Sequence, residues 1–215
     1  TSPIELIRQY RKFSIYPPED KSWQINSAGF IGNDDLLVGV MDYSDYNNYI
    51  YRYSSGVWTG WVPPGYGTNR VNLNDALLTP GGKLFALVGY GNSASACLIE
   101  GDNNTCHLSS AVFNSLAACG ETVYAVGNAG AIAVYRDGVW SSEASGTDNN
   151  LTEVACSANE VYAVGEKRTA IWKTNSASAS WQPVSNLTEK EYYEFTDLVY
   201  GSNTGFTASL KAPQT

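Results

Sequence analysis

The chain has 215 residues, of which 43% are apolar and 16% charged, a balance typical of a folded domain and unlike that of a disordered chain. The formal net charge of −8 argues against nucleic acid as a partner, because phosphate binding needs clustered lysine and arginine. No apolar run approaches the roughly 18 residues of a transmembrane helix, so we expect no membrane insertion of this segment.

The first 12 residues are expected to form a short N-terminal helix or extension. The stretch "SPIEL" places Ser2 before a proline and Glu5 three residues later, which is the pattern of a capping box. The following "IELIRQYRKF" can form a short amphipathic helix that packs on the rim of the main domain. We expect that domain to span residues 13–215.

A phrase with an aromatic residue at its centre recurs along the chain. It appears as "LFALVG" around Phe85, "VYAVG" around Tyr124 and again around Tyr162, and "GFTAS" around Phe206, with spacings of 39, 38 and 44 residues. Four short apolar or alternating runs fill one repeat, as in "LTEVACS", "EVYAVGE", "TAIWKTN" and "SWQPVS". Four short strands about every 40 residues are the pattern of a β-propeller blade. A β-sandwich is the alternative.

We therefore predict an all-β chain that forms a β-propeller of five four-stranded blades. Four continuous blades are expected at residues 25–61, 71–109, 113–145 and 151–185. The last repeat holds only two strands, and "FSIYPPEDKSWQ", Phe13–Gln24, resembles the second half of a blade. The N-terminal segment should thus supply the outer strands and the C-terminal segment the inner strands of a fifth blade. Such closure of the ring removes two exposed sheet edges.

Residues 41–70 depart most from the repeat and are rich in aromatic residues. Tyrosine, tryptophan, Asp, Asn and Arg together suit a surface that stacks on sugar rings or meets a protein. Some of these aromatics must face neighbouring blades, and we assign Tyr51 and Trp58 to the core. The predicted ligand-contacting residues lie nearer the loop tips: Tyr43, Tyr46, Trp61, Tyr66 and Arg70.

The four cysteines fall at paired positions. Cys97 and Cys106 flank the polar "LIEGDNNT", which is typical of a hairpin turn, and Cys119 and Cys156 precede the two "VYAVG" phrases. We expect disulfides Cys97–Cys106 and Cys119–Cys156, formed in an oxidising compartment. Free thiols are the alternative. A zinc site would use tighter spacing and usually histidine, and the single histidine is His107.

The sequence assigns no catalytic residue, metal ligand or cofactor. Acidic residues such as Asp34 and Asp35 could pair for acid–base chemistry, but "GNDDLL" is first a turn sequence. A serine nucleophile could use only His107 as its base. Asp42, Asp45 and Asn47 could bind calcium, although an ordinary polar loop is the favoured explanation. An enzyme is therefore the least favoured class.

Two stretches resemble the Asp-box of sialidase-type propellers, whose form is Ser-x-Asp-x-Gly-x-Thr-Trp. "TNSASASW", ending at Trp181, has the same length, with Ser176 in the Asp position and Ser178 in the Gly position. "YRDGVW" is shorter and keeps Asp137 and Gly138. The repeats also resemble those of photosystem assembly-factor propellers. The resemblance implies a propeller, but in such folds the motif is a structural turn and implies little about chemistry. The six arginines give no sialidase-like triad.

These features lead us to expect an extracellular or cell-surface binding module. Its role would be adhesin-like or lectin-like, with a glycan or a surface protein as partner. A structural or assembly component of a larger extracellular machine is the alternative, and a glycoside hydrolase is the lesser alternative.

Overall fold

The structure is a computed structural model, and it describes residues 4–8, 11–15, 23–31, 35–42, 47–61, 72–90, 93–100, 103–107, 111–185, 187, 193–201 and 205–211. These residues form antiparallel sheets, four with four strands and two with two strands. In each sheet the strands follow one another in chain order. The repeats of the sequence therefore correspond to successive strand meanders.

The four larger sheets agree closely with the predicted continuous blades. Sheet 1 contains β3 (Trp23–Ile31), β4 (Asp35–Asp42), β5 (Asn47–Ser54) and β6 (Val57–Trp61). Sheet 2 contains β7 (Asn72–Leu78), β8 (Leu84–Tyr90), β9 (Ser93–Glu100) and β10 (Asn103–Cys106). Sheet 3 contains β11 (Phe113–Cys119), β12 (Thr122–Gly127), the short 3-10 turn η1 (Asn128–Gly130), β13 (Ala131–Arg136) and β14 (Val139–Ala144). Sheet 4 contains β15 (Leu151–Cys156), β16 (Glu160–Gly165), β17 (Ala170–Thr174) and β18 (Gln182–Pro183).

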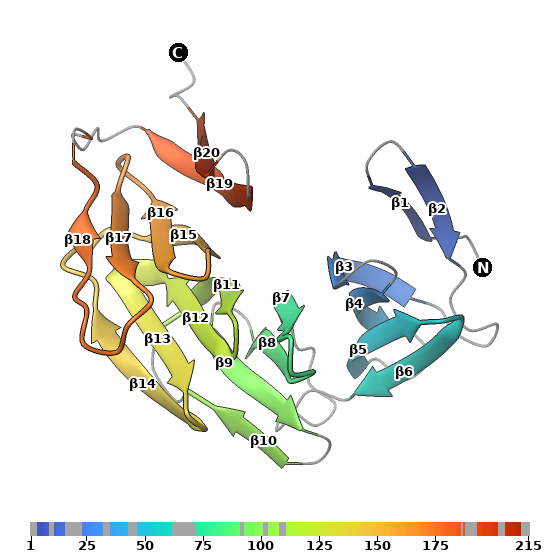
Figure 1. Cartoon of the computed structure of the whole chain (residues 1–215). Coiled ribbons are helices and arrows are strands. Elements are labelled where there is room, and N and C mark those ends of the chain that lie inside the picture. The colour runs from blue at the N-terminus through green and yellow to red at the C-terminus, as the bar shows by residue number, and fades with distance from the viewer. Residues whose placement is uncertain are drawn as a thin grey trace.

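Two hairpins lie at the ends of this series. The N-terminal hairpin pairs β1 (Ile4–Arg8) with β2 (Arg11–Ile15), and the C-terminal hairpin pairs β19 (Glu194–Gly201) with β20 (Gly205–Lys211). The sheets follow one another around an arc, with one hairpin at each end (Figure 1). The first strands β3, β7, β11, β15 and β19 contact one another in this order. The start of each repeat therefore lies on the inner side of the arc.

The predicted N-terminal helix is wrong. Its residues form the β1–β2 hairpin, in which Ile4 is paired with Ile15 and Leu6 with Phe13. Apolar residues at alternate positions fit this pairing, whereas an isolated helix of this length is marginal in water. The predicted outer strands within Phe13–Gln24 are also misplaced, since β2 ends at Ile15 and Trp23 begins β3 of sheet 1.

The core consists of the apolar layers between successive sheets. Between sheets 3 and 4, Tyr124, Val126 and Ile132 pack with Leu151 and Trp181. A second layer, between sheets 2 and 3, includes Phe85, Phe113 and Tyr135. Removing these side chains from water on both sides of a sheet is the main force that holds the series together. Of the aromatic residues at the centre of the repeated phrases, Phe85 and Tyr124 are thus core residues, and Tyr162 and Phe206 are partly buried against a further cluster.

Every first strand carries a β-bulge at the same place. The register shifts fall between Ile25 and Ser27, Leu73 and Asp75, Phe113 and Ser115, Leu151 and Glu153, and Phe195 and Asp197. The second residue of each pair, which follows the bulge, is polar in all five strands. A bulge turns that side chain away from the regular pleat.

The polar residue after the bulge connects one sheet with the next. The Leu116 backbone N–H of sheet 3 donates to Asp75 Oδ2 of sheet 2, at 2.9 Å. In the same way the Val154 N–H of sheet 4 donates to Ser115 Oγ of sheet 3, at 3.4 Å. Equivalent residues thus make equivalent contacts across two successive junctions.

The glycine that closes each "VYAVG" phrase allows a close approach of two backbones. A Cβ at Gly127 would collide with the Val112 carbonyl oxygen, and a Cβ at Gly165 with that of Asn150. The residues after these glycines, Asn128 and Glu166, donate backbone hydrogen bonds to the same two carbonyls. The repeated glycine is therefore a steric requirement of the strand pairing at the bulge.

The "YRDGVW" stretch forms a tight hairpin turn. Asp137 and Gly138 both have positive φ, 51° and 89°, and Ser55 and Gly56 repeat this geometry in sheet 1 with 51° and 85°. Positive φ at both central residues is the requirement of a two-residue type I′ hairpin. In the longer "TNSASASW" turn, the Ser176 and Ser178 hydroxyls lie 3.2 Å apart.

Candidate functional site

Most of the predicted ligand-contacting residues lie outside the described residues. These are Tyr43, Tyr46, Tyr66 and Arg70. Trp61 is the last residue of β6 and is paired with Ile50. The structure therefore does not test whether the five residues form one surface. Tyr51 and Trp58 pack edge to face, with ring centroids 6.1 Å apart, against the buried residues of β4, as expected of core residues.

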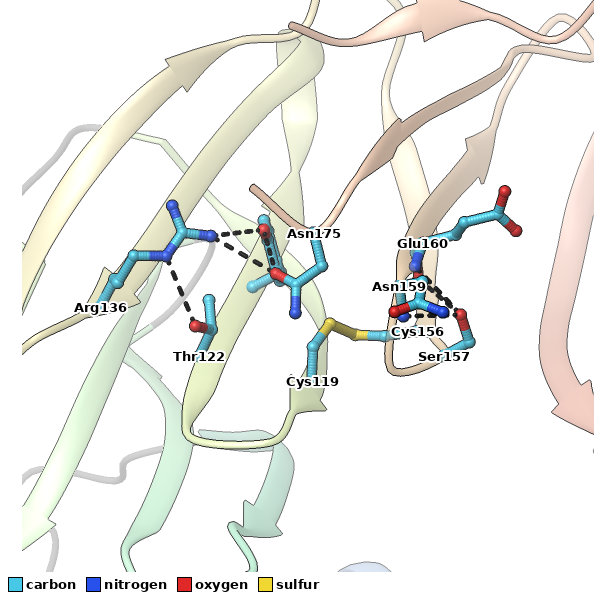
Figure 2. The surroundings of a disulfide bond; sticks show 9 residues. Cys119, Thr122, Arg136, Cys156, Ser157, Asn159, Glu160 and Asn175 are labelled. Carbon is cyan, nitrogen blue, oxygen red and sulfur yellow. Dashed lines mark hydrogen bonds between the residues drawn. A yellow bond between two sulfur atoms is a disulfide. The ribbon is translucent and has the colours of Figure 1, made fainter. Parts of the chain in front are cut away.

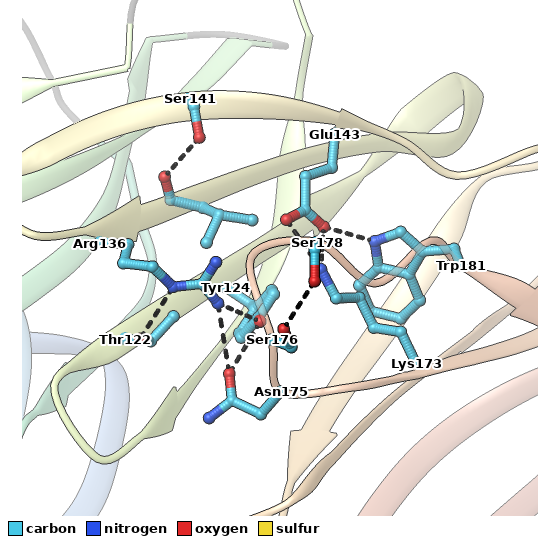
Figure 3. A network of polar contacts seen from close by, with 11 residues as sticks. Thr122, Tyr124, Arg136, Ser141, Glu143, Lys173, Asn175, Ser176, Ser178 and Trp181 are labelled. Atoms are coloured by element: carbon cyan, nitrogen blue, oxygen red, sulfur yellow. Dashed lines mark hydrogen bonds and ion pairs between the residues drawn. The ribbon is translucent and has the colours of Figure 1, made fainter.

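The junction of sheets 3 and 4 contains a buried ion pair. Lys173 of β17 has a side chain with 0% exposure, and its Nζ lies 2.8 Å from both carboxylate oxygens of Glu143 on β14. The rings of Tyr124 and Trp181 lie 5.7 and 5.8 Å from the same Nζ. The Trp181 indole N–H donates to Glu143 Oε2 at 2.8 Å (Figure 3). The ammonium is thus paired, and Trp181 is fixed in orientation.

A second polar group lies at the same junction, nearer to the ends of the first strands. Arg136 Nη2 donates to the Tyr124 hydroxyl at 2.9 Å, and this hydroxyl donates to Asn175 Oδ1 at 2.9 Å (Figure 3). Figure 2 shows Arg136 and Asn175 in the surroundings of the Cys119–Cys156 disulfide. Burial raises the pKa of Tyr124, so the phenol keeps the proton that it donates. The group connects β12 and β13 with the turn after β17.

The Cys119–Cys156 disulfide is present and joins the ends of β11 and β15. The two Cα atoms lie 5.5 Å apart, well inside the ~7 Å that a disulfide allows. The prediction that these two strand ends are neighbours is therefore confirmed. In the β9–β10 hairpin, Cys106 is the register partner of Cys97, the arrangement that the second predicted bridge requires.

A pocket opens at the opposite end of the junction. It has a volume of about 150 Å³ and lies between the connection from β14 to β15 and the strands β17 and β18. Its lining residues are Ser145, Gly146, Thr147, Arg168, Thr169, Ala170, Ile171, Trp181, Pro183 and Leu187. Trp181 therefore belongs both to the ion-pair group and to the pocket wall.

Arg168 is the basic residue of the pocket wall. Its Nε is buried and has no hydrogen-bond partner among the residues that the structure describes. The backbone there is constrained, because Lys167 and Arg168 both have positive φ, 52° and 60°. The Arg168 N–H donates to the Tyr193 carbonyl at 2.9 Å, and the adjacent Thr169 hydroxyl accepts from Asn149 at 2.8 Å. A tight, hydrogen-bonded turn thus carries a guanidinium whose Nε–H donor has no partner among the described residues.

Carboxylates after the bulges form a separate polar region. Burial raises the pKa of Asp75. Burial also raises the pKa of Glu153, and the charges of Asp75 and Asp197 raise it further, while a hydrogen bond from Ser115 opposes the shift. Among the residues that the structure describes, no group of three or more His, Cys, Asp or Glu side chains is placed to hold a metal ion.

His107 takes part in the junction between sheets 2 and 3. Its Nε2 lies 3.2 Å from the Ser142 hydroxyl, and its ring packs against Phe113 and Trp140. Burial lowers the pKa of His107. Trp140 adds a hydrogen bond from its indole N–H to the Thr105 carbonyl, at 3.1 Å. The position of His107 between two sheets is that of an interface residue.

Sequence reasoning did not predict the pocket. In the sequence, Arg168 is one of six arginines, and Trp181 is the last residue of the Asp-box-like turn. The pocket is lined by residues 145–147, 168–171, 181, 183 and 187, which come from separate connections and strands. No spacing within one repeat indicates their proximity. Within the described parts of the chain, no helix is long and apolar enough to cross a membrane.

Comparison with solved structures identifies the fold. No protein-family model matches the chain, and no curated protein matches it. The structure of YCF48 from Cyanidioschyzon merolae is similar with a TM-score of 0.63 and 10% sequence identity, covering 94% of this chain and 68% of that one. A structure described as YCF48 bound to D1 peptide is similar with a TM-score of 0.53 and 16% identity, covering 89% of this chain and 62% of that one. At these identities the similarity concerns the fold alone, and the chain has a propeller-like all-β fold.

Proposed function

We propose that the chain is a binding module that holds a segment of a partner protein. The observation that carries this proposal is the pocket at the junction of sheets 3 and 4, which Arg168 lines together with the apolar Trp181 and Leu187. Arg168 Nε is buried there without a hydrogen-bond partner among the described residues. Concave sites with apolar walls and a few oriented polar groups are typical ligand sites. A surface of this kind suits an extended segment that inserts one side chain.

The frame around the pocket supports the proposal. The Glu143–Lys173 pair lies on one side of Trp181 and fixes β14 relative to β17. The Cys119–Cys156 bridge joins the first strands of the same two sheets. A preformed site loses little conformational entropy on binding.

A protein segment is favoured over a glycan by one comparison. The similar YCF48 structure is described as bound to a peptide, so a scaffold of this shape accepts a peptide ligand. The glycan hypothesis rests on the predicted ligand-contacting residues, which are four aromatic residues and one arginine: Tyr43, Tyr46, Trp61, Tyr66 and Arg70. For the compartment we propose an extracellular or cell-surface location, since disulfides persist in oxidising surroundings.

A binding screen tests this function. The purified chain is applied to an array of random peptides and to a glycan array, and it is incubated with a panel of chromogenic glycosides. We expect peptide hits that weaken in Arg168→Gln and persist in Lys167→Gln, a matched control that removes an exposed charge from the same turn. Hits on glycans alone would favour the lectin-like role, and glycoside cleavage would favour the hydrolase. Absence of binding in both arrays and of glycoside cleavage, with co-purification in a larger complex, would favour the assembly role.

We further propose that the two terminal hairpins complete a fifth blade, in the order β19-β20-β1-β2. β12 and β16, the second strands of sheets 3 and 4, are mostly buried, whereas β20 is exposed from residue 207 to residue 211. Val199, Tyr200 and Leu210 of this hairpin are large apolar residues exposed to solvent. A third and a fourth strand would cover this surface, and β2 precedes β3 as β14 precedes β15.

Cysteine cross-linking tests this closure. Ser209→Cys on β20 is combined in turn with Glu5→Cys, Leu6→Cys and Ile7→Cys on β1, and each variant is oxidised. We expect one combination to form an intrachain bridge in the monomer. A disulfide-linked dimer would instead indicate that the hairpin of a second copy occupies the edge, and the absence of any bridge would reject the proposed pairing.

A further inference from the structure

The pocket at the junction of sheets 3 and 4 has room for one small ring or branched group. Its volume of about 150 Å³ is similar to that of engineered cavities that hold a benzene molecule. Ile171 and Trp181 of the wall are only 4% and 6% exposed. The indole N–H of Trp181 is already engaged by Glu143. Trp181 therefore has no free donor to offer a ligand, and its contribution to the wall is apolar.

The wall of the pocket also carries a positively charged side chain, that of the half-buried Arg168. Its Nε is buried without a hydrogen-bond partner among the described residues, and an unmade hydrogen bond of a buried donor is costly. No ion pair joins Arg168 to a carboxylate within the described part of the chain. The carboxylate that is nearest in sequence, Glu166, accepts from Asn150 at 2.9 Å. Among the described residues no acceptor is therefore placed on Arg168 Nε, and a bound ligand can supply one.

The polar groups of the remaining wall are engaged with one another. The Ser145 hydroxyl donates to the Thr147 carbonyl at 3.0 Å and accepts from the Thr147 N–H at 3.3 Å. The Thr169 hydroxyl accepts from Asn149. We expect selection among ligands to depend mainly on the apolar wall and on the guanidinium, whose parallel N–H donors match the two oxygens of a carboxylate.

We propose that this pocket binds an aromatic or branched apolar group that lies next to a carboxylate, with the apolar group against Trp181 and Ile171 and the carboxylate on Arg168. In a protein segment this corresponds to an apolar residue beside Asp or Glu. The inference rests on the proposed function, since it names the chemistry of the segment that the same pocket accepts. The chain's net charge of −8 opposes acidic ligands elsewhere, so the preference for a carboxylate is local to this turn.

A fragment panel tests the inference on the intact chain. Phenylacetate, phenylacetamide, phenethylamine and acetate are each titrated into the isotope-labelled protein, and chemical-shift changes are followed by NMR. We expect phenylacetate to bind with a millimolar dissociation constant, as its size allows, and to shift the amides of Thr169 and Ala170. The amide and acetate should bind at least about tenfold more weakly, because each lacks one of the two features.

Three variants make the test specific. Arg168→Gln should remove the preference for phenylacetate over phenylacetamide, and Arg168→Lys should retain part of it. Lys167→Gln should retain the preference, because this exposed residue does not line the pocket. The Arg168 variants should fold, since no hydrogen bond from the Arg168 side chain is lost, and a thermal melt checks this.

Several results would overturn the inference. They are equal binding of phenylacetate and phenylacetamide, shifts that map away from Thr169 and Ala170, or a preference that survives Arg168→Gln. If the fragments fail while the peptide array gives hits that depend on other residues, only the ligand chemistry named for this pocket is wrong. If both fail, the proposed function is wrong as well.

Discussion

The Glu143–Lys173 pair allows a quantitative test of how sheets 3 and 4 are joined. In Glu143→Gln, the fully buried Lys173 side chain loses both of its 2.8 Å contacts with a carboxylate. Breaking a buried pair on one side costs about 3–5 kcal/mol. Glu143 is 19% exposed, so water can partly replace the lost charge, and we expect the lower end, about 3 kcal/mol. For a chain of this length that corresponds to a fall in Tm of about 6–12 °C.

Urea unfolding followed by tryptophan fluorescence measures this change. Asp148→Asn is the matched control, because Asp148 is exposed. The double variant Glu143→Gln/Lys173→Met should recover most of the loss, since it removes the unpaired charge and leaves the amide carbonyl of the introduced glutamine to accept from Trp181. A single variant within about 1 kcal/mol of wild type, below the loss expected of a broken buried pair, would refute the reasoning. A double variant less stable than the single one would do the same.

Three further changes have defined outcomes. Replacing Cys119 and Cys156 with serine should lower the free energy of unfolding by about 3–4 kcal/mol by the chain-entropy estimate, given their separation of 37 residues. Gly165→Ala should lower it by about 1–3 kcal/mol, because the new Cβ meets the Asn150 carbonyl. Glu153→Gln should raise it at pH 7, and this gain should shrink as the pH falls to about 4.5 and below. The folded-state pKa of Glu153 is raised, so the ionised form is penalised above that pKa, and the penalty disappears as protonation becomes complete.

Each of these outcomes has a result that contradicts it. Non-reducing peptide mapping that finds Cys97 linked to Cys119, or Cys106 linked to Cys156, would refute the assigned sheet boundaries. An unchanged urea midpoint for Gly165→Ala would show that the carbonyl can move aside. For Glu153→Gln, a gain that is equal at pH 7 and pH 4.5, or one that Asp148→Asn reproduces, would exclude the proposed titration.

Much of the strand order follows from the sequence because the information is local and repeated. Each "VYAVG" phrase needs only its neighbours to form a second strand, and its copy in the next repeat supports the assignment. The position of Cys119 and Cys156 before these phrases placed them at equivalent strand ends, which predicted the bridge. The glycines Gly127 and Gly165 belong to the same pattern, but their reason, contact with a carbonyl before the first strand, is visible only in three dimensions.

The errors arise where a local signal competes with a distant partner. Ser2 and Glu5 form a capping-box pattern, yet pairing of Ile4 with Ile15 and Leu6 with Phe13 gives a hairpin. The candidate site fails to appear in the sequence for a related reason. Glu143 and Lys173 are 30 residues apart, and no pattern within one sheet indicates that a strand of the next will bring the counter-charge. The pocket around Arg168 depends on the same junction.

In the bulge contacts, a side chain of one sheet binds the backbone of the next sheet. Asp75 accepts from the Leu116 amide, and Ser115 accepts from the Val154 amide, so at these two junctions the acceptor comes from the bulge residue of the earlier sheet and the donor from the backbone of the later one. Backbone amides are present in any sequence, whereas the acceptor is encoded within the repeat that uses it. We therefore expect that a duplicated repeat would keep the same bulge contact with the sheet before it and with the sheet after it. The number of sheets in such a chain can change by whole genetic units, without a new interface having to evolve.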